Sequence, residues 1–112
     1  MASTHLSSNS CVPCQGSAPP LTLEAASTLI TRVPRWELSA DAKRLSRRFV
    51  FDDFVAAMKF VNQVAVVAEQ QGHHPDIGIH WNLVELTLWT HKIGGLHEND
   101  FVLAAHIDEL QE

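Results

Sequence analysis

Between Asp52 and Gly72 the apolar residues recur at helical spacing, and on both sides of this stretch the spacing changes to alternation. The helical stripe consists of Phe54, Ala57, Met58, Val61, Ala65 and Ala68. Asp52 is expected to cap the helix, and Gly72 is expected to end it. One long amphipathic helix between alternating segments favours a fold in which helices pack against a sheet.

The alternating segments predict two pairs of short strands. The first pair spans 36–38 and 43–51, joined by a turn at 39–41, and the second spans 77–81 and 84–91, joined near Asn82. In the last strand, one face carries Val84, Leu86 and Leu88, and the opposite face carries Glu85, Thr87, Trp89 and His91. The apolar face is expected to contact the core.

A helix is also predicted at each end of the domain. Thr22 can cap a helix that runs to about residue 32, where Val33-Pro34 stops it. The last helix follows Gly94-Gly95 and runs from His97 to about residue 111, with capping-box spacing between His97 and Asp100. The sequence therefore predicts an α+β fold: a four-stranded antiparallel sheet with three helices on one face, in the order α-β-β-α-β-β-α.

The chain has 112 residues, a length that suits one domain. Residues 1–20 are rich in Ser and Pro and are predicted to form a flexible N-terminal arm, so the domain is placed at residues 21–112. The balance of 8 basic and 13 acidic residues argues against a nucleic-acid partner. Because no apolar run approaches about 18 residues and the first ten residues lack a secretory pattern, we expect a cytoplasmic protein that does not contact a membrane.

Two cysteines, Cys11 and Cys14, form a single Cys-x-x-Cys in the arm. A structural zinc site needs four ligands and no second pair of cysteines is present, so no metal site is predicted. A redox-active pair usually opens a helix after a strand, whereas this pair lies among prolines. We interpret the two residues as peripheral thiols or an incidental disulfide, with metal binding through the cysteines and His5 as the alternative.

Among the seven histidines, His73 and His74 are adjacent and precede Pro75 in a loop after the long helix. Several imidazoles in one pocket can exchange protons with a substrate at neutral pH without a cofactor, because a free histidine has a pKa of about 6.5. His91, at the end of the last strand, is a third candidate. The alternative is that each one is a surface or capping histidine. Because adjacent residues point apart on an extended chain, His73 and His74 are poorly placed to chelate one metal ion.

A longer spacing pattern connects these histidines with other residues. Its members are Glu69, His73-His74-Pro75, Trp81, His91 and Asp100. This pattern closely resembles that of the pterin-4a-carbinolamine dehydratase family, and the similarity covers roughly residues 21–110. The arm, with Cys11 and Cys14, looks like that of a bacterial-type member.

The resemblance implies an enzyme, a hydro-lyase that removes water from a 4a-hydroxytetrahydropterin and yields a quinonoid dihydropterin. The reaction recycles the tetrahydrobiopterin used by aromatic amino-acid hydroxylases, and it requires neither a metal nor an organic cofactor. Members of the family assemble into homodimers or homotetramers by joining sheet edges and packing helices. The resemblance thus implies a pterin substrate and further copies of the chain as partners.

By position, the resemblance implies that His73, His74 and His91 are the catalytic histidines. The leaving hydroxyl needs a proton and a ring nitrogen must lose one, so we expect His73 and His91 to be the main acid/base pair. His74 would then orient the substrate or assist proton transfer. The residues leave open which histidine is the acid and which is the base.

Five further residues are expected at the substrate site: Glu69, Pro75, Thr90, Lys92 and Ile93. Pro75 would fix the loop, and residues 90–93 would line the pterin site. Glu69 would orient a histidine by a hydrogen bond. Asp100 would either position the turn that carries His91 or cap the last helix.

Two other functions stay open at this level. Some relatives serve as dimerisation cofactors of a transcription factor, so an oligomeric interaction module is one alternative, and a metal-binding protein is the other. Trp89 lies on the same strand face as His91, where it would line a pocket or a subunit interface. The remaining histidines, His5, His80, His97 and His106, are interpreted as arm, strand, cap and surface residues.

Overall fold

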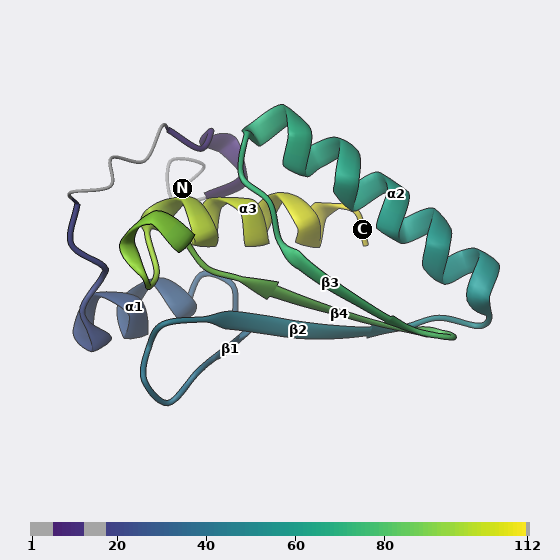
Figure 1. The fold of residues 1–112 in the computed structure, drawn as a ribbon, viewed down its shortest axis with the longest axis horizontal. Helices are drawn as coiled ribbons and strands as arrows, with labels where there is room; N and C mark the ends of the chain where they lie inside the picture. The colour runs from purple at the N-terminus through teal and green to yellow at the C-terminus, as the bar shows by residue number, and fades with distance from the viewer. Residues whose placement is uncertain (1–5, 13–17, 112) are drawn as a thin grey trace.

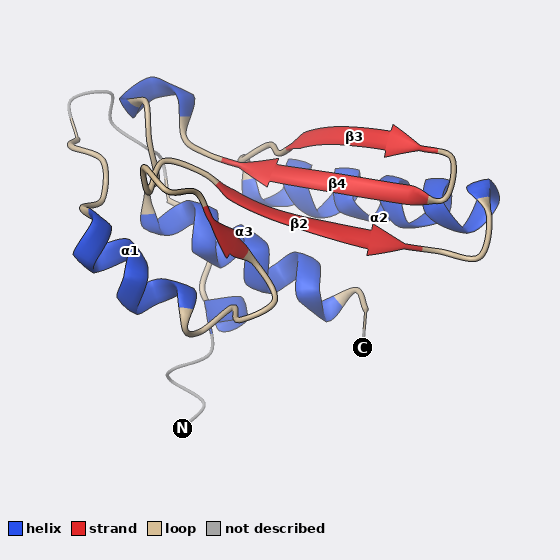
Figure 2. Ribbon diagram, turned by 90° about the horizontal axis from the view of Figure 1, so that it is seen from below, coloured by secondary structure: helices blue, strands red, loops and turns tan. Residues whose placement is uncertain are grey.

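The sheet has four antiparallel strands in the order β1-β2-β4-β3. The strands are β1 (Glu37–Leu38), β2 (Leu45–Val50), β3 (Asp76–His80) and β4 (Leu83–Leu88). A computed structural model describes residues 6–12 and 18–111 of the chain, and Figures 1 and 2 show its ribbon. The central strands β2 and β4 pair over their whole length, from Leu45 opposite Leu88 to Val50 opposite Leu83.

Three α-helices pack with this sheet: α1 (Leu23–Ile30), α2 (Phe54–Gln71) and α3 (Glu98–Glu109). Helices α2 and α3 lie side by side on one face of the sheet, and α1 lies near the end of the sheet that carries β1 (Figures 1 and 2). Two short 3₁₀ helices, η2 (Leu6–Ser8) and η3 (His91–Ile93), complete the described elements. The predicted α+β fold and its order of elements are confirmed.

The core lies between the inner face of the sheet and helices α2 and α3. As predicted, the alternating residues Leu45, Phe49, Val84, Leu86 and Leu88 are buried. Helix α3 is central to the core, and its residues Phe101, Leu103, Ala104 and Ile107 have no exposed surface. Burial of this much apolar surface is the main force that holds the helices on the sheet.

Helix α2 begins one residue later than predicted. Asp53, not Asp52, is its N-cap, because the Asp53 backbone is extended and its side chain accepts a 2.8 Å hydrogen bond from the backbone N–H of Ala56. The helix ends at Gly72, as predicted. Gly72 has a φ of 66°, in the left-handed region where glycine avoids a steric penalty.

The predicted apolar stripe of α2 was only partly right. The buried residues of the helix are Ala57, Phe60, Val61, Val64 and Ala68. Phe54 is 48% exposed and Ala65 is also exposed. The buried face of α2 is the one that carries Phe60, because the ring of Phe60 packs against those of Phe49 and Phe51 on the sheet side. A second apolar face of α2 is left on the surface.

The second strand pair is shorter than predicted at two points. Trp81 is a turn residue with a φ of 55°, not the end of β3, because the β3–β4 hairpin reverses between His80 and Leu83. At the other end, β4 stops at Leu88, so the expectation that His91 ends a strand was wrong. His91 instead begins η3, since Thr90 pairs with Gly95 and the chain turns between them.

No helix in the described part of the chain is long and apolar enough to cross a membrane.

Candidate active site

A cleft of about 710 Å³ lies where the C-terminal end of α2 and the residues after β4 approach the start of α3. Of the residues expected at the substrate site, the cleft is lined by His73, His74, Pro75, Thr90, His91 and Lys92. Glu69 and Ile93 do not line it. The fold therefore gathers all three candidate histidines around one cavity, although His73 and His74 come from the loop after α2 and His91 comes from the start of η3.

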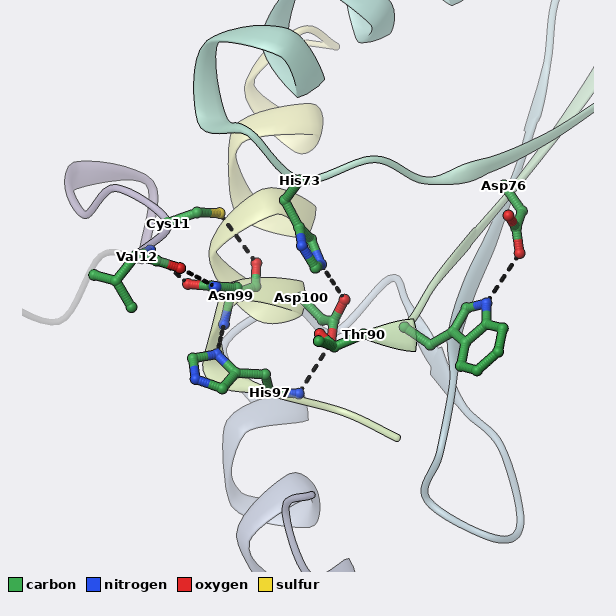
Figure 3. Close-up of polar contacts among 9 residues, drawn as sticks. Cys11, Val12, His73, Asp76, Thr90, His97, Asn99 and Asp100 are labelled. Carbon is green, nitrogen blue, oxygen red and sulfur yellow. Dashed lines mark hydrogen bonds and ion pairs between the residues drawn. The ribbon is translucent and has the colours of Figure 1, made fainter. Parts of the chain in front are cut away.

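His73 is held from behind by a buried carboxylate. Its Nε2 lies 2.6 Å from Oδ1 of Asp100 (Figure 3), and the two side chains are 12% and 0% exposed. A carboxylate only accepts hydrogen bonds, so Nε2 carries the proton of this bond. In the neutral ring Nδ1 then keeps its lone pair. A carboxylate that fixes the tautomer of a histidine in this way is the usual arrangement behind a catalytic base.

Asp100 receives two further hydrogen bonds. Oδ2 accepts from Oγ1 of Thr90 at 2.8 Å and from the backbone N–H of His97 at 3.0 Å (Figure 3). The second bond belongs to a capping box, in which Nδ1 of His97 accepts in return from the backbone N–H of Asn99. Asp100 thus caps α3 and also holds Thr90, which directly precedes His91. The two roles weighed for Asp100 from the sequence are both present, together with its bond to His73.

His74 forms a hydrogen bond with a different acid from the one that binds His73. Its Nε2 lies 2.5 Å from Oε2 of Glu69, and the side chains are 61% and 78% exposed. Because both groups are well solvated, this pair contributes little to stability. It does fix the direction of the His74 ring at the rim of the cleft.

His91 is oriented by an aromatic contact. Its ring stacks on Trp89 with a centroid distance of 3.8 Å, and the guanidinium of Arg44 lies 4.1 Å from the Trp89 ring centroid. The indole Nε1 of Trp89 donates a 3.0 Å hydrogen bond to Asp76. Within the described residues the His91 ring makes no hydrogen bond, so both its nitrogens are free to meet a ligand in the cleft.

Sequence reasoning missed several residues of the cleft: Cys11, Val12, Gln71, Asp76 and Asn99. Burial raises the pKa of the Cys11 thiol from 9.0 to about 11, and the negative charge of Asp100 adds to the rise. Cys11 is therefore protonated at neutral pH, and its Sγ donates to the backbone carbonyl of Asn99 at 3.5 Å. Cys11 and Cys14 were expected to be peripheral, but Cys11 lines the cleft; Cys14 lies outside the described residues.

The described residues contain no cluster of three His, Cys, Asp or Glu side chains that could hold a metal ion. His5 and Cys14, which belonged to the alternative metal site, lie outside the described part of the chain.

The sequence matches known proteins over nearly its whole length. The profile of the family "Pterin 4 alpha carbinolamine dehydratase" matches residues 19–110. A protein of Methylococcus capsulatus, named "Putative pterin-4-alpha-carbinolamine dehydratase", is 50% identical over 110 residues, which is 98% of this chain and 96% of that protein. A protein of Halorhodospira halophila with the same name is 48% identical over 94% of this chain and 96% of that protein.

Two solved structures of pterin dehydratase or pterin dehydratase-like proteins have a similar fold. A transcriptional coactivator/pterin dehydratase from Brucella melitensis superposes with a TM-score of 0.77 at 29% identity, over 83% of this chain and 99% of that one. A pterin dehydratase-like protein, described as a RuBisCO assembly factor in the alpha-carboxysome, superposes with a TM-score of 0.58 at 26% identity, over 67% of this chain and 87% of that one. The spacing of the histidines, the fold and the profile match together show that the chain belongs to the pterin-4a-carbinolamine dehydratase family.

Proposed function

We propose that this protein removes water from a 4a-hydroxytetrahydropterin and releases a quinonoid dihydropterin, without a metal or an organic cofactor. The observation that carries the proposal is the cleft in which His73, backed by the buried Asp100, lies together with His74 and His91. Membership of the family supports the reaction class. The tetrahydropterin product of recycling would serve an aromatic amino-acid hydroxylase.

In this proposal His73 is the general base. Its Nε2 proton is engaged by Asp100, so the lone pair on Nδ1 is the one that can accept a proton. Nδ1 takes the proton from a ring N–H of the substrate. The electron pair of that N–H bond then forms the new C=N bond between the ring nitrogen and C4a. The carboxylate of Asp100 stabilises the imidazolium that results.

His91 is the general acid of the proposal. No hydrogen bond to a described residue occupies its ring, so a protonated His91 can donate to the 4a-hydroxyl. The C–O bond breaks, the hydroxyl leaves as water, and the electron pair from the ring nitrogen replaces it at C4a. The proton taken by His73 and the proton given by His91 balance, so the enzyme returns to its starting state by exchange with solvent.

The other predicted residues have supporting roles. Glu69 does not line the cleft, and we assign it the orientation of His74, which would guide the substrate. Ile93 is also outside the lining, and its backbone N–H bonds to Thr90 and shapes the turn that carries His91. Pro75, Thr90 and Lys92 line the cleft and would contact the pterin directly.

The test is the rate of dehydration of a 4a-hydroxytetrahydropterin generated in situ and followed by stopped-flow absorbance. His73→Ala and His91→Ala should each lower kcat by roughly 10²- to 10⁴-fold, the range in which a general acid or base contributes. His80→Ala is the matched control, because His80 is 65% exposed and lies outside the cleft. Unchanged turnover in both cleft variants, with circular dichroism unchanged, rejects the assignment.

We further propose that the protein forms a homo-oligomer through the exposed apolar face of α2. Val55 and Val66 are 76% and 58% exposed there, and together with Phe54 and Met58 they line a shallow groove of about 670 Å³. A contiguous apolar patch on a surface favours protein–protein contact. Light scattering after size exclusion should give a smaller mass for Val66→Glu than for the wild type, and the same mass for Gln70→Glu.

The same face favours the second candidate function, an interaction module that docks another protein. The two functions are separated by catalysis at low enzyme concentration. A rate of carbinolamine dehydration well above the uncatalysed rate, lost in His91→Ala, supports the enzyme. No acceleration by the wild type supports the module.

A further inference from the structure

We propose that residues 6–12, called here the N-terminal strap, form one wall of the pterin cleft and set its affinity for substrate. This inference rests on the proposed dehydratase function. The strap lies outside residues 19–110, which the family profile matches. In Figure 1 it runs between the C-terminal end of α2 and helix α3, although α2 begins more than 40 residues later.

Two hydrogen bonds from the side chain of Asn99 hold the strap at the start of α3. The side-chain Oδ1 of Asn99 accepts from the backbone N–H of Val12 at 2.8 Å, and its Nδ2 donates to the Val12 carbonyl at 2.6 Å (Figure 3). Asn99 is only 4% exposed. A buried amide that satisfies both backbone groups of one residue holds that residue in a single position, because releasing it would leave polar groups unpaired.

A second tie connects the strap to α2. The backbone N–H of Cys11 donates to Oε1 of Gln71 at 2.8 Å. Gln71 is the last residue of α2 and stands two positions before His73, whereas Asn99 stands directly before Asp100. The strap therefore links the two helix ends that present the His73–Asp100 pair.

The far end of the strap is anchored away from the cleft. Leu6 is 3% exposed and belongs to the hydrophobic core. The His106 ring also binds the strap, with Nε2 donating to the carbonyl of Asn9 at 2.8 Å. These anchors order the strap before any ligand arrives, so a substrate does not have to order it on binding.

The strap contributes two side chains to the cleft, those of Cys11 and Val12. One is a protonated thiol and the other an isopropyl group, and together they present a mainly apolar surface. An apolar wall of this kind favours contact with the flat ring of a pterin, because ligand pockets are lined mainly by apolar groups that bury the ligand away from water. Loosening the strap should therefore weaken binding, while the proton transfers at His73 and His91 continue.

The first test loosens the strap from two sides. Leu6→Ala removes its core anchor, and His106→Ala removes the hydrogen bond to the carbonyl of Asn9; neither residue lines the cleft. Each should raise KM about three- to tenfold and change kcat less than about twofold. Glu109→Ala is the matched control on α3, the helix that carries His106, since Glu109 is exposed and lies outside the cleft. An unchanged KM in both strap variants overturns the inference.

The second test does not depend on turnover. In a Cys14→Ser chain Cys11 is the remaining cysteine, and its alkylation by iodoacetamide is followed by mass spectrometry at pH 9. Saturation with 7,8-dihydrobiopterin, with binding checked by tryptophan fluorescence, should slow the alkylation at least about fivefold. Unchanged alkylation with pterin bound overturns the inference. Failure of the proposed function looks different: the wild-type chain then does not accelerate dehydration.

Discussion

The Nε2 atom of His73 and the Oδ1 atom of Asp100 lie 2.6 Å apart, although the two residues are 27 positions apart in the chain. The loop after α2 supplies the imidazole, and the first turn of α3 supplies the carboxylate. Because Asp100 also accepts hydrogen bonds from Thr90 and from the backbone of His97, one buried side chain joins three segments at the cleft.

Replacement of Asp100 by Asn keeps the shape of the side chain and removes its negative charge, so it tests whether His73 needs the charge. An amide of the same shape does not fix the tautomer of His73 or stabilise its imidazolium, so we expect kcat to fall roughly 10²- to 10³-fold. Stopped-flow kinetics measure the effect. Asp52→Asn is the control, because Asp52 is exposed and forms no hydrogen bond with the described residues. A kcat within threefold of the wild type would show that His73 does not need the carboxylate.

The stack between Trp89 and His91 should matter for the acid step. Trp89→Leu removes the aromatic partner of His91, and an aromatic pair is worth about 0.5–1.5 kcal/mol. We expect kcat to fall roughly three- to tenfold. Trp89→Phe keeps a ring under His91 but loses the bond to Asp76, so it should retain most of the activity. Equal losses in both variants would assign the effect to the indole N–H instead.

The raised pKa of the Cys11 thiol predicts how the stability of the fold and the alkylation of Cys11 depend on pH. Its folded pKa of about 11 exceeds the ordinary value of 9.0, because of burial first and the charge of Asp100 second. The unfolded thiol therefore ionises first as pH rises, so its contribution to folding is fully present below about pH 9 and is lost between about 9 and 11. In a Cys14→Ser chain at pH 8, alkylation of Cys11 should be roughly 100-fold slower when folded than in urea.

Removing the thiol provides the check on that prediction. Cys11→Ser in the same Cys14→Ser chain should abolish the loss of stability between about pH 9 and 11, measured by urea unfolding at each pH. If folded and unfolded chains are alkylated at similar rates, the thiol is not shielded.

The cap of α3 can be changed without touching the catalytic bond. His97→Ala removes the acceptor for the Asn99 N–H, and loss of an N-cap costs about 1 kcal/mol. We expect the Tm to fall by roughly 4–8 °C, and His97→Ser to recover most of the loss. The backbone N–H that binds Asp100 remains in both variants, so kcat should stay within about twofold. A large drop in kcat would mean that the His97 side chain has a role at the cleft.

Local signals in the sequence were enough for most of the fold. Gly72, Thr22 and the His97–Asp100 spacing mark helix ends through hydrogen bonds between residues a few positions apart, and the structure has these ends. The face of α2 was harder, because the helix is apolar on two sides. Only the packing of Phe60 against the strands decides which side is buried.

The cleft could be predicted only in part. His73, His74 and His91 were found because their spacing matches a family pattern. The bond from Asp100 to His73 was not found, since no periodicity relates two residues brought together by the crossing of α3 behind the loop. Asn99 and Val12 were missed for the same reason: their mutual bonds join residues 87 positions apart.

Asp100 both binds His73 and holds the start of α3 and Thr90 in place, and this combination has an evolutionary consequence. A library of variants selected only for folding would retain this aspartate, because its loss breaks the capping box of α3 and leaves the Thr90 hydroxyl and the His97 N–H without an acceptor. Its persistence among relatives would therefore not distinguish active enzymes from members that have lost catalysis and kept the fold. The ring of His91 makes no hydrogen bond within the described residues, so it carries no such structural constraint, and the presence or absence of this histidine is the sharper marker of retained chemistry.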